Sequence, residues 1–226
     1  MNAQTFEKDS FKTKSGKNLD IFFIKHSSLI LKYNGYLIYV DPVTMFTNYS
    51  LQPQADMILV THEHADHFDP NAIDTLKKEN TKIILNLSTR DKLGEGTDIK
   101  NGDKINPEPF LSIEAVPAYN TTPGREHFHP KGRDNGYILT IDGLRIYIAG
   151  DTEDIPEMNN IKNIDIAFLP VNQPYTMTVD QAVHAAKMIK PVILYPYHYS
   201  DTNVEEIKTR LATESPAIEV RIRELQ

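Results

Sequence analysis

The chain has 226 residues, a net charge of −7, no cysteine and hydrophobic residues at 40% of its positions. This length suits one α/β domain of ordinary size or at most two small ones, and without a linker signal we expect a single domain over residues 1–226. The acidic charge argues against nucleic acid or an anionic membrane surface as the main partner. The missing cysteines exclude a thiolate nucleophile, a disulfide framework and a cysteine-based zinc site. The sequence begins without the apolar stretch of a signal peptide and holds no apolar run of membrane-spanning length, so we expect a cytoplasmic protein.

The first part of the sequence is rich in strand and hairpin signals. Strands are expected at residues 19–24, 29–33 and 36–40, where Asn34-Gly35 forms a hairpin turn and Asp41-Pro42 ends the last strand. A short apolar stretch at 57–60 indicates a buried strand, and a helical pattern follows at 71–79. A strand at 82–85, a short helix at 88–93 and a strand at 111–116 complete this part.

The second part alternates strands and helices more regularly. A hairpin is expected at 137–149 around Asp142-Gly143, followed by a strand at 164–169. The clearest helix covers residues 178–189, because Thr178 and Gln181 form a capping box before one apolar stripe. A strand at 192–195, a helix at 203–212 and a strand at 218–221 follow. This order predicts an α/β (α+β) fold with two mixed sheets and outer helices rather than one doubly wound sheet.

The most informative stretch is Thr61-His-Glu-His-Ala-Asp-His67, which places His62, His64, Asp66 and His67 within six positions. Imidazole and carboxylate are ligands that zinc and similar divalent metals accept. The stretch follows a buried strand, at the edge of a sheet where α/β proteins place their ligand sites. The whole chain has eight histidines, so such a cluster is improbable by chance. We therefore interpret it as a metal site rather than as a polar loop.

Four other expected strand ends carry residues that can bind a metal or a ligand. These residues are His26, Asn120, Asp151 and His198. Several ligand-capable strand ends make a metal site more credible than the His-rich stretch alone does.

These motifs together resemble those of a known family. His-x-His-x-Asp-His, then Gly-Asp-Thr at 150–152, then the late His198 resemble the metallo-β-lactamase-fold hydrolases. The segments 24–28 and 39–42 are similar to the branch of ascorbate-phosphate lactonase-like and uncharacterised metal-dependent hydrolases. The resemblance runs from about residue 19 to the C-terminus. It implies a four-layer αββα sandwich with the metals at one edge between the sheets.

The resemblance also implies the roles of individual side chains. A metal-bound hydroxide would attack an ester, lactone or phosphodiester bond, Asp66 would orient that hydroxide, and His62 and His64 would share in catalysis. One or two divalent ions are expected per chain, with zinc first and manganese, iron or nickel as alternatives. The implied ligands are His62 and His64 for the first metal, Asp66, His67 and His198 for the second, and Asp151 as the bridge.

One position departs from the family pattern. The family normally supplies a third histidine to the first metal, and Asn120 stands at the position that looks equivalent. An amide oxygen is a poor zinc ligand compared with imidazole. His129 or His127 from the following loop would replace the ligand, or His26 would do so. Alternatively, one site is weak or empty and the enzyme is mononuclear, and we rank such an altered site first.

Further candidates lie around this set. Asp41 would orient a ligand histidine or would simply end a turn. Arg125, Lys131 and Arg133 form a basic loop that would bind an anionic group of the substrate, with an ordinary solvated loop as the alternative. Tyr197 would line the substrate pocket or pack on the sheet edge.

The sequence therefore predicts a metal-dependent hydrolase acting on a small, anionic metabolite. We expect a small-molecule substrate, no nucleic-acid or membrane partner, and self-association into a homo-oligomer as an option. The alternative is a non-catalytic metal-binding or ligand-sensing protein on the same fold, which the departure at Asn120 keeps open.

Overall fold

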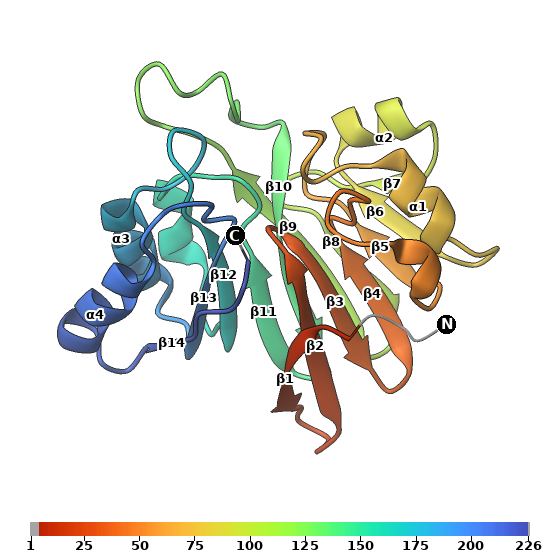
Figure 1. The fold of residues 1–226 in the computed structure, drawn as a ribbon, viewed down its shortest axis with the longest axis horizontal. Helices are drawn as coiled ribbons and strands as arrows, with labels where there is room; N and C mark the ends of the chain where they lie inside the picture. The colour runs from red at the N-terminus through yellow and green to blue at the C-terminus, as the bar shows by residue number, and fades with distance from the viewer. Residues whose placement is uncertain (1–4, 226) are drawn as a thin grey trace. The chain divides into compact units, whose positions relative to one another are not determined.

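The computed structural model describes residues 5–225, and the chain divides into two compact units that meet in the sequence between Ile99 and Lys100. Within the described residues, each unit contains one seven-stranded sheet (Figure 1). The two mixed sheets expected from the order of the sequence elements are therefore confirmed. The expectation of a single domain over residues 1–226 remains a prediction.

The sheet of the first unit follows the order of the chain. Strands β1 to β4 pair antiparallel, and β4 to β7 pair parallel. The switch occurs because β5 and β6 are reached by crossovers and not by hairpins. The elements are β1 (Glu7–Lys12), β2 (Asn18–Lys25), β3 (Ser28–Tyr33), β4 (Tyr36–Val40), η1 (Tyr49–Leu51), β5 (Met57–Leu59), α1 (Pro70–Leu76), β6 (Lys82–Leu85), α2 (Leu87–Leu93) and β7 (Thr97–Asp98).

One face of this sheet supplies the core of the first unit. Tyr39 and Ile58 are paired across β4 and β5, and both are fully buried with Ile73 and Leu76 of α1. The hairpin between β3 and β4 turns at Asn34 and Gly35, which both have positive φ, as the twist-matched two-residue turn requires. The sequence prediction of this hairpin is confirmed.

The sheet of the second unit has the same mixed character. Strands β8 to β11 pair antiparallel, and β11 to β14 pair parallel. Figure 1 shows α3 and α4 beside the parallel strands of this unit. The elements are β8 (Lys104–Glu108), β9 (Leu111–Ala118), β10 (Asp134–Ile141), β11 (Leu144–Ile148), η2 (Pro156–Asn160), β12 (Ile166–Pro170), α3 (Val179–Ile189), β13 (Ile193–Tyr197), α4 (Glu205–Glu214) and β14 (Glu219–Val220).

Local sequence signals account for the ends of these elements. Thr178 caps α3 through the predicted capping box with Gln181, and both hydrogen bonds of the box are present. Gly136 lies on β10 where a Cβ atom would approach Ala149 O to 2.7 Å. Only glycine fits there without a shift of the β11 end, two residues before Asp151.

Three strands were missed by the sequence analysis, namely β1, β7 and β8. β1 and β8 are edge strands with exposed or half-buried side chains, and β8 contains Pro107. β7 has two exposed residues and also lies at an edge. Charge and proline protect a sheet edge from further pairing and at the same time remove the alternating apolar pattern by which a strand is recognised.

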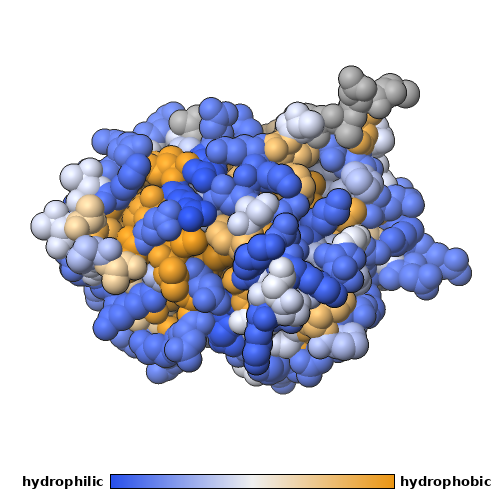
Figure 2. All heavy atoms as spheres, turned by 90° about the horizontal axis from the view of Figure 1, so that it is seen from below, coloured by the Kyte–Doolittle hydropathy of each residue, from blue (hydrophilic) through white to orange (hydrophobic). Residues whose placement is uncertain are grey.

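Among the described residues, no helix has both the length and the apolar character needed to cross a lipid bilayer. Much of the face drawn in Figure 2 is hydrophilic, with apolar side chains gathered in patches between the polar ones.

Candidate metal centre

In the first unit, the His-rich stretch forms the loop between β5 and α1. The main-chain N–H groups of His67 and Phe68 both donate to His64 O, so the loop turns tightly at its middle. Asp69 caps α1, accepting a hydrogen bond from Asn71 N, and Pro70 occupies the first helical turn. The strand before the loop and the cap after it therefore hold the four predicted ligands in a short, well-defined segment.

His62 and His64 bring two imidazole nitrogens together. His62 Nε2 and His64 Nδ1 are 3.1 Å apart, and the rings meet edge to face. Tetrahedral zinc, with Zn–N bonds of about 2.0–2.1 Å, places two ligand nitrogens about 3.3 Å apart. The spacing of this pair therefore fits two ligands of one divalent metal.

His67 is oriented by Asp41, which follows β4. His67 Nδ1 donates to Asp41 Oδ2 at 2.8 Å, and both side chains are fully buried. Thr61 donates to the same carboxylate from its main-chain N–H and from its hydroxyl. The Nδ1 donation leaves Nε2 as the ligand atom of His67, an arrangement common for metal-binding histidines. The predicted orienting role of Asp41 agrees with this geometry. Thr61, which sequence analysis overlooked, shares that role.

His26 lies on the Asp66 side of this cluster. His26 Nε2 is 3.1 Å from Asp66 Oδ2, and His67 Nε2 is 3.9 Å from the same oxygen. The ligand atoms of His26, Asp66 and His67 all lie within 4.8 Å of one another. His26 also has a φ of 58°, a strained backbone conformation that often accompanies functional sites.

In the second unit, two histidines approach one oxygen of Asp151. His129 Nε2 and His198 Nε2 are each 3.3 Å from Asp151 Oδ2, and all three side chains are buried. Asp151 follows β11 and His198 follows β13, which flank β12 as parallel neighbours. The carboxyl ends of parallel strands share one edge of the sheet, so the topology itself brings Asp151 and His198 together.

Asn120 is turned toward the loop that follows it. Its amide nitrogen donates to Tyr175 O at 2.7 Å and to Arg125 O at 3.3 Å. Its main-chain N–H donates to His129 O at 2.9 Å, which ties the two residues together. Asn120 thus anchors the loop, while His129 carries an imidazole to Asp151.

The two residues that directly follow Asp151, Thr152 and Glu153, also anchor the loop that begins after Asn120. Glu153 is fully buried and accepts hydrogen bonds from the main-chain N–H groups of Thr121 and Thr122, both at 2.7 Å. Thr152 exchanges hydrogen bonds with the Tyr119 main chain. Sequence analysis did not select Thr152 or Glu153 for a role, although both directly follow Asp151 in the Gly-Asp-Thr motif.

Two of the three basic side chains in the predicted basic loop already form ion pairs with carboxylates of the protein. Arg133 forms a bidentate ion pair with Asp134: Nε donates to Oδ1 at 2.7 Å and an η nitrogen donates to Oδ2 at 2.8 Å. Burial raises the pKa of the Asp134 carboxyl above its ordinary value of 3.8, and the Arg133 guanidinium opposes that rise. Lys131 donates to Glu157 at 2.9 Å, whereas Arg125 donates to the neutral Gln173 side chain. Of the three, Arg125 is the one whose side chain donates to a neutral group rather than to a carboxylate.

The remaining candidates are separated by their burial. Tyr197 is fully buried and donates its hydroxyl to Gly150 O at 3.3 Å, which agrees with the packing alternative rather than with substrate contact. His127 is exposed, and its ring lies tilted against the ring of Phe128, with centroids 4.1 Å apart. His129 lies only two positions further along the same loop, but in contrast to His127 it is buried, with 1% of its surface exposed.

Comparison with known proteins identifies the family. A profile described as the β-lactamase superfamily domain matches residues 20–198. A UPF0173 metal-dependent hydrolase of Nanoarchaeum equitans is 31% identical over 195 residues, covering 80% of this chain and 84% of that protein. The chain belongs to the UPF0173 metal-dependent hydrolases of the β-lactamase superfamily. The resemblance seen in its motifs is thereby confirmed.

Solved structures agree with this membership. A Parabacteroides distasonis protein described as a metal-dependent hydrolase is 61% identical, with a TM-score of 0.96 over 98% of this chain and 100% of that chain. The metallo-β-lactamase fold protein YhfI of Bacillus subtilis is 15% identical and has a TM-score of 0.70, with 88% of each chain covered. This UPF0173 hydrolase therefore has the metallo-β-lactamase fold, as the sequence motifs implied.

Proposed function

We propose that the chain hydrolyses a small anionic metabolite at a centre of two divalent metals. The observation that carries this proposal is the approach of His129 and His198 to one oxygen of Asp151, which suits a bridging carboxylate. The family profile covers residues 20–198, which include every ligand proposed for the two metals. The proposed ligands are His62, His64 and His129 for one metal, Asp66, His67 and His198 for the other, and Asp151 between them.

His129 takes the place of the family's third histidine in this proposal. It is buried, its Nε2 is 3.3 Å from Asp151, and it is tied to Asn120 through the main chain. Asn120 directs its amide nitrogen to carbonyl groups of the protein instead. This favours a complete first site over the altered site that the sequence alone placed first.

The donor set fits zinc, because it consists of imidazole nitrogens and carboxylate oxygens without sulfur. Manganese, iron and nickel accept the same donors, so the identity of the metal is proposed from ligand chemistry alone. A divalent metal bound here would supply an activated water near neutral pH and would polarise an oxygen of the substrate.

Around such a metal, the side chains of this protein have separate tasks. Asp66 is 42% exposed and lies beside His26 at 3.1 Å, so its carboxylate can hold a water proton and direct the attack on the substrate. Asp41 keeps His67 in the ligating tautomer through its 2.8 Å hydrogen bond. Arg125, paired with a neutral amide, is proposed to bind the substrate's anionic group.

The substrate class is proposed as an ester, lactone or phosphodiester. Zinc-loaded protein should be assayed on a chromogenic phosphodiester, an aryl ester and a simple lactone, with metal content measured on the same samples. We expect turnover of at least one of the three and loss of that turnover in His64→Ala. Protein that holds its metals and turns over none of them would contradict hydrolysis of these three bond types.

A further inference from the structure

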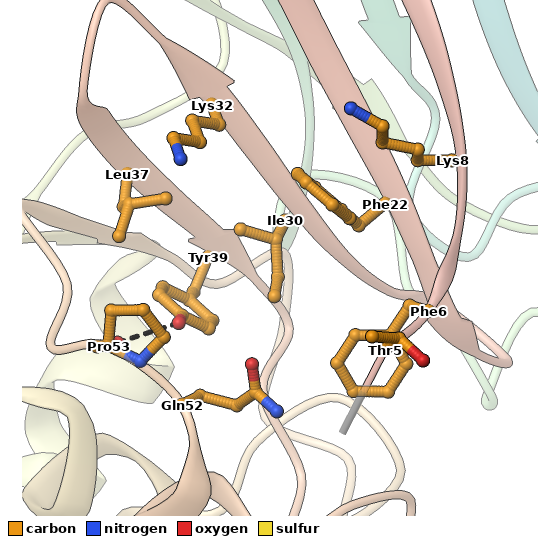
Figure 3. A pocket seen from close by; sticks show the side chains of 10 residues that line it. All are labelled: Thr5, Phe6, Lys8, Phe22, Ile30, Lys32, Leu37, Tyr39, Gln52 and Pro53. Carbon is orange, nitrogen blue, oxygen red and sulfur yellow. Dashed lines mark hydrogen bonds between the residues drawn. The ribbon is translucent and has the colours of Figure 1, made fainter. Parts of the chain in front are cut away.

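The first unit contains a pocket that none of the proposed metal ligands lines. The pocket has a volume of about 310 Å³, near the lower end of the range for small-molecule sites, roughly 300–1,000 Å³. Figure 3 shows its side chains around a common space. The lining residues are Thr5, Phe6, Lys8, Phe22, Ile30, Lys32, Leu37, Tyr39, Gln52 and Pro53.

The pleat of the sheet explains why these side chains meet. Lys8, Phe22, Ile30 and Tyr39 are register partners in turn across β1, β2, β3 and β4, so they form one row on one face. Tyr39 and Ile30 are buried in the core of the unit, whereas Phe22, closer to the edge, is only partly buried. The pocket is thus the end of an apolar sheet face that the core does not fully cover.

The polar groups of the pocket are not evenly distributed. Figure 3 shows Lys8 and Lys32 on one side of Phe22 and Ile30, and Gln52 on the other side. Lys8 donates to Asp20 at 3.0 Å, and Asp20 also accepts from Ser10. Lys32 is exposed and lies opposite Asp20 in the register of β2 and β3, where its charge acts on the Asp20 carboxylate, although Lys32 forms no direct ion pair within the described residues. Two ammonium groups and one carboxylate leave a net positive charge at this rim, although the chain as a whole is acidic.

We propose that this pocket binds a small amphiphilic monocarboxylate. Its head group would lie between Lys8 and Lys32, and its apolar chain or ring would lie against Phe22 and Ile30. A few directed polar groups beside an apolar surface are the usual design of a small-ligand site. The site is independent of the proposed hydrolytic centre, so it can be tested by binding alone.

A second copy of the chain is a poorer occupant. In a two-fold symmetric contact the same patch meets itself, so the Lys8 and Lys32 ammonium groups of one copy would face those of the other. Like charges placed opposite each other oppose association. A carboxylate, in contrast, complements the rim charge.

The direct test is calorimetric titration of the intact protein with octanoate. We expect saturable binding of octanoate, weaker binding of hexanoate and much weaker binding of the uncharged octanol. Each methylene group placed against the apolar wall should strengthen binding by roughly two- to fourfold. Equal binding of octanoate and octanol would overturn the assignment of the head group to the lysines.

Two variants locate the site. Lys32→Ala should weaken octanoate binding by about fivefold or more, since it removes the ammonium group that has no ion pair. Lys14→Ala is the matched control, because Lys14 is an exposed lysine of the same unit that does not line the pocket. Leu37→Trp should fill the pocket and abolish binding, with thermal unfolding used to confirm that the variant is folded.

The proposal fails if wild-type protein binds no octanoate at millimolar concentration, or if Lys32→Ala and Lys14→Ala bind it equally well. It also fails if folded Leu37→Trp retains wild-type affinity. Light scattering distinguishes the second-copy alternative. Self-association of wild-type protein that Leu37→Trp abolishes, without octanoate binding, would identify the patch as a contact between copies.

Discussion

The ligand sets of the two units differ in how far apart their residues lie in the sequence. In the first unit, His62, His64, Asp66 and His67 come from one loop after β5, and Asp41, which follows the neighbouring parallel strand β4, orients His67. In the second unit, His129, Asp151 and His198 come from a long loop and from the ends of two different strands. The first set depends on one local turn, and the second depends on correct assembly of a whole sheet edge.

This difference suggests where each set is sensitive. In the first set, the carboxylate of Asp41 supports a ligand histidine, since it accepts hydrogen bonds from both His67 and Thr61. In the second set, the carboxylate of Asp151 is itself a proposed ligand, and both His129 and His198 lie close to it. Removing the carboxylate should therefore weaken metal binding in the first unit and destroy the centre in the second.

The largest effect is expected for Asp151→Asn. The substitution removes the charge and one oxygen that the proposed bridge needs. Activity should fall by more than about a hundredfold, since even residues that only support ligands contribute 10- to 100-fold. Metal content by elemental analysis should fall for both ions. Asp154→Asn is the control, because Asp154 binds the exposed His184 of α3. Full metal content in Asp151→Asn would contradict its bridging role.

A smaller effect is expected for Asp41→Asn. The neutral amide can no longer hold the His67 imidazole as strongly or stabilise its ligating tautomer. Metal affinity, measured by competition with a chelator, should fall by about 10- to 100-fold. An unchanged affinity would show that Asp41 serves only the packing of the loop with Thr61.

Arg125 and Arg133 should separate substrate binding from stability. Arg125→Ala should raise KM for an anionic substrate by about tenfold and leave KM for a neutral one unchanged. Arg133→Ala should instead lower the free energy of unfolding by about 3 kcal/mol, because it leaves the buried Asp134 carboxylate without its partner. If Arg133→Ala changes KM selectively for the anion while stability is preserved, the two roles have been assigned the wrong way round.

The smallest effect is expected at the cap of α1. Asp69 accepts hydrogen bonds from Thr44 N and Asn71 N, both at 2.9 Å. Burial acts to raise its pKa, but the hydrogen bonds hold the pKa below the ordinary value of 3.8. Asp69→Ala should therefore cost about 1 kcal/mol at neutral pH. The difference between wild type and variant should shrink as the pH falls below about 4, because the lowered pKa stabilises the fold only while Asp69 is charged.

Urea unfolding at pH 7, pH 5 and pH 3 would measure this difference. A gap between the two proteins that does not change with pH would show that Asp69 acts through geometry alone.

The same contrast between local and distant residues explains what could be predicted from the sequence. Met57 to Leu59, the His-rich loop and the capped helix α3 carry local signals, and all were located correctly. The edge strands β1 and β8 lack such signals because their side chains are charged or half-exposed. The burial of Asp134 and of Tyr197 depends on neighbours whose positions only the fold defines.

The choice between His127 and His129 shows this limit most clearly. Both lie in one loop of glycine, proline and charged residues, and nothing in their spacing decides which one is buried. The decisive contacts are the His129 carbonyl with Asn120 and the His129 imidazole with Asp151. Both contacts join residues brought together only by folding.

The number of metal atoms per chain, measured for wild type, His129→Ala and His127→Ala, shows whether His129 is a ligand of a two-metal centre. We predict about two for the wild type, about one for His129→Ala and the wild-type value for His127→Ala, because the two histidines share a loop but only His129 reaches Asp151. Wild-type content in His129→Ala, or a single metal in the wild type, would contradict a two-metal centre in which His129 is a ligand.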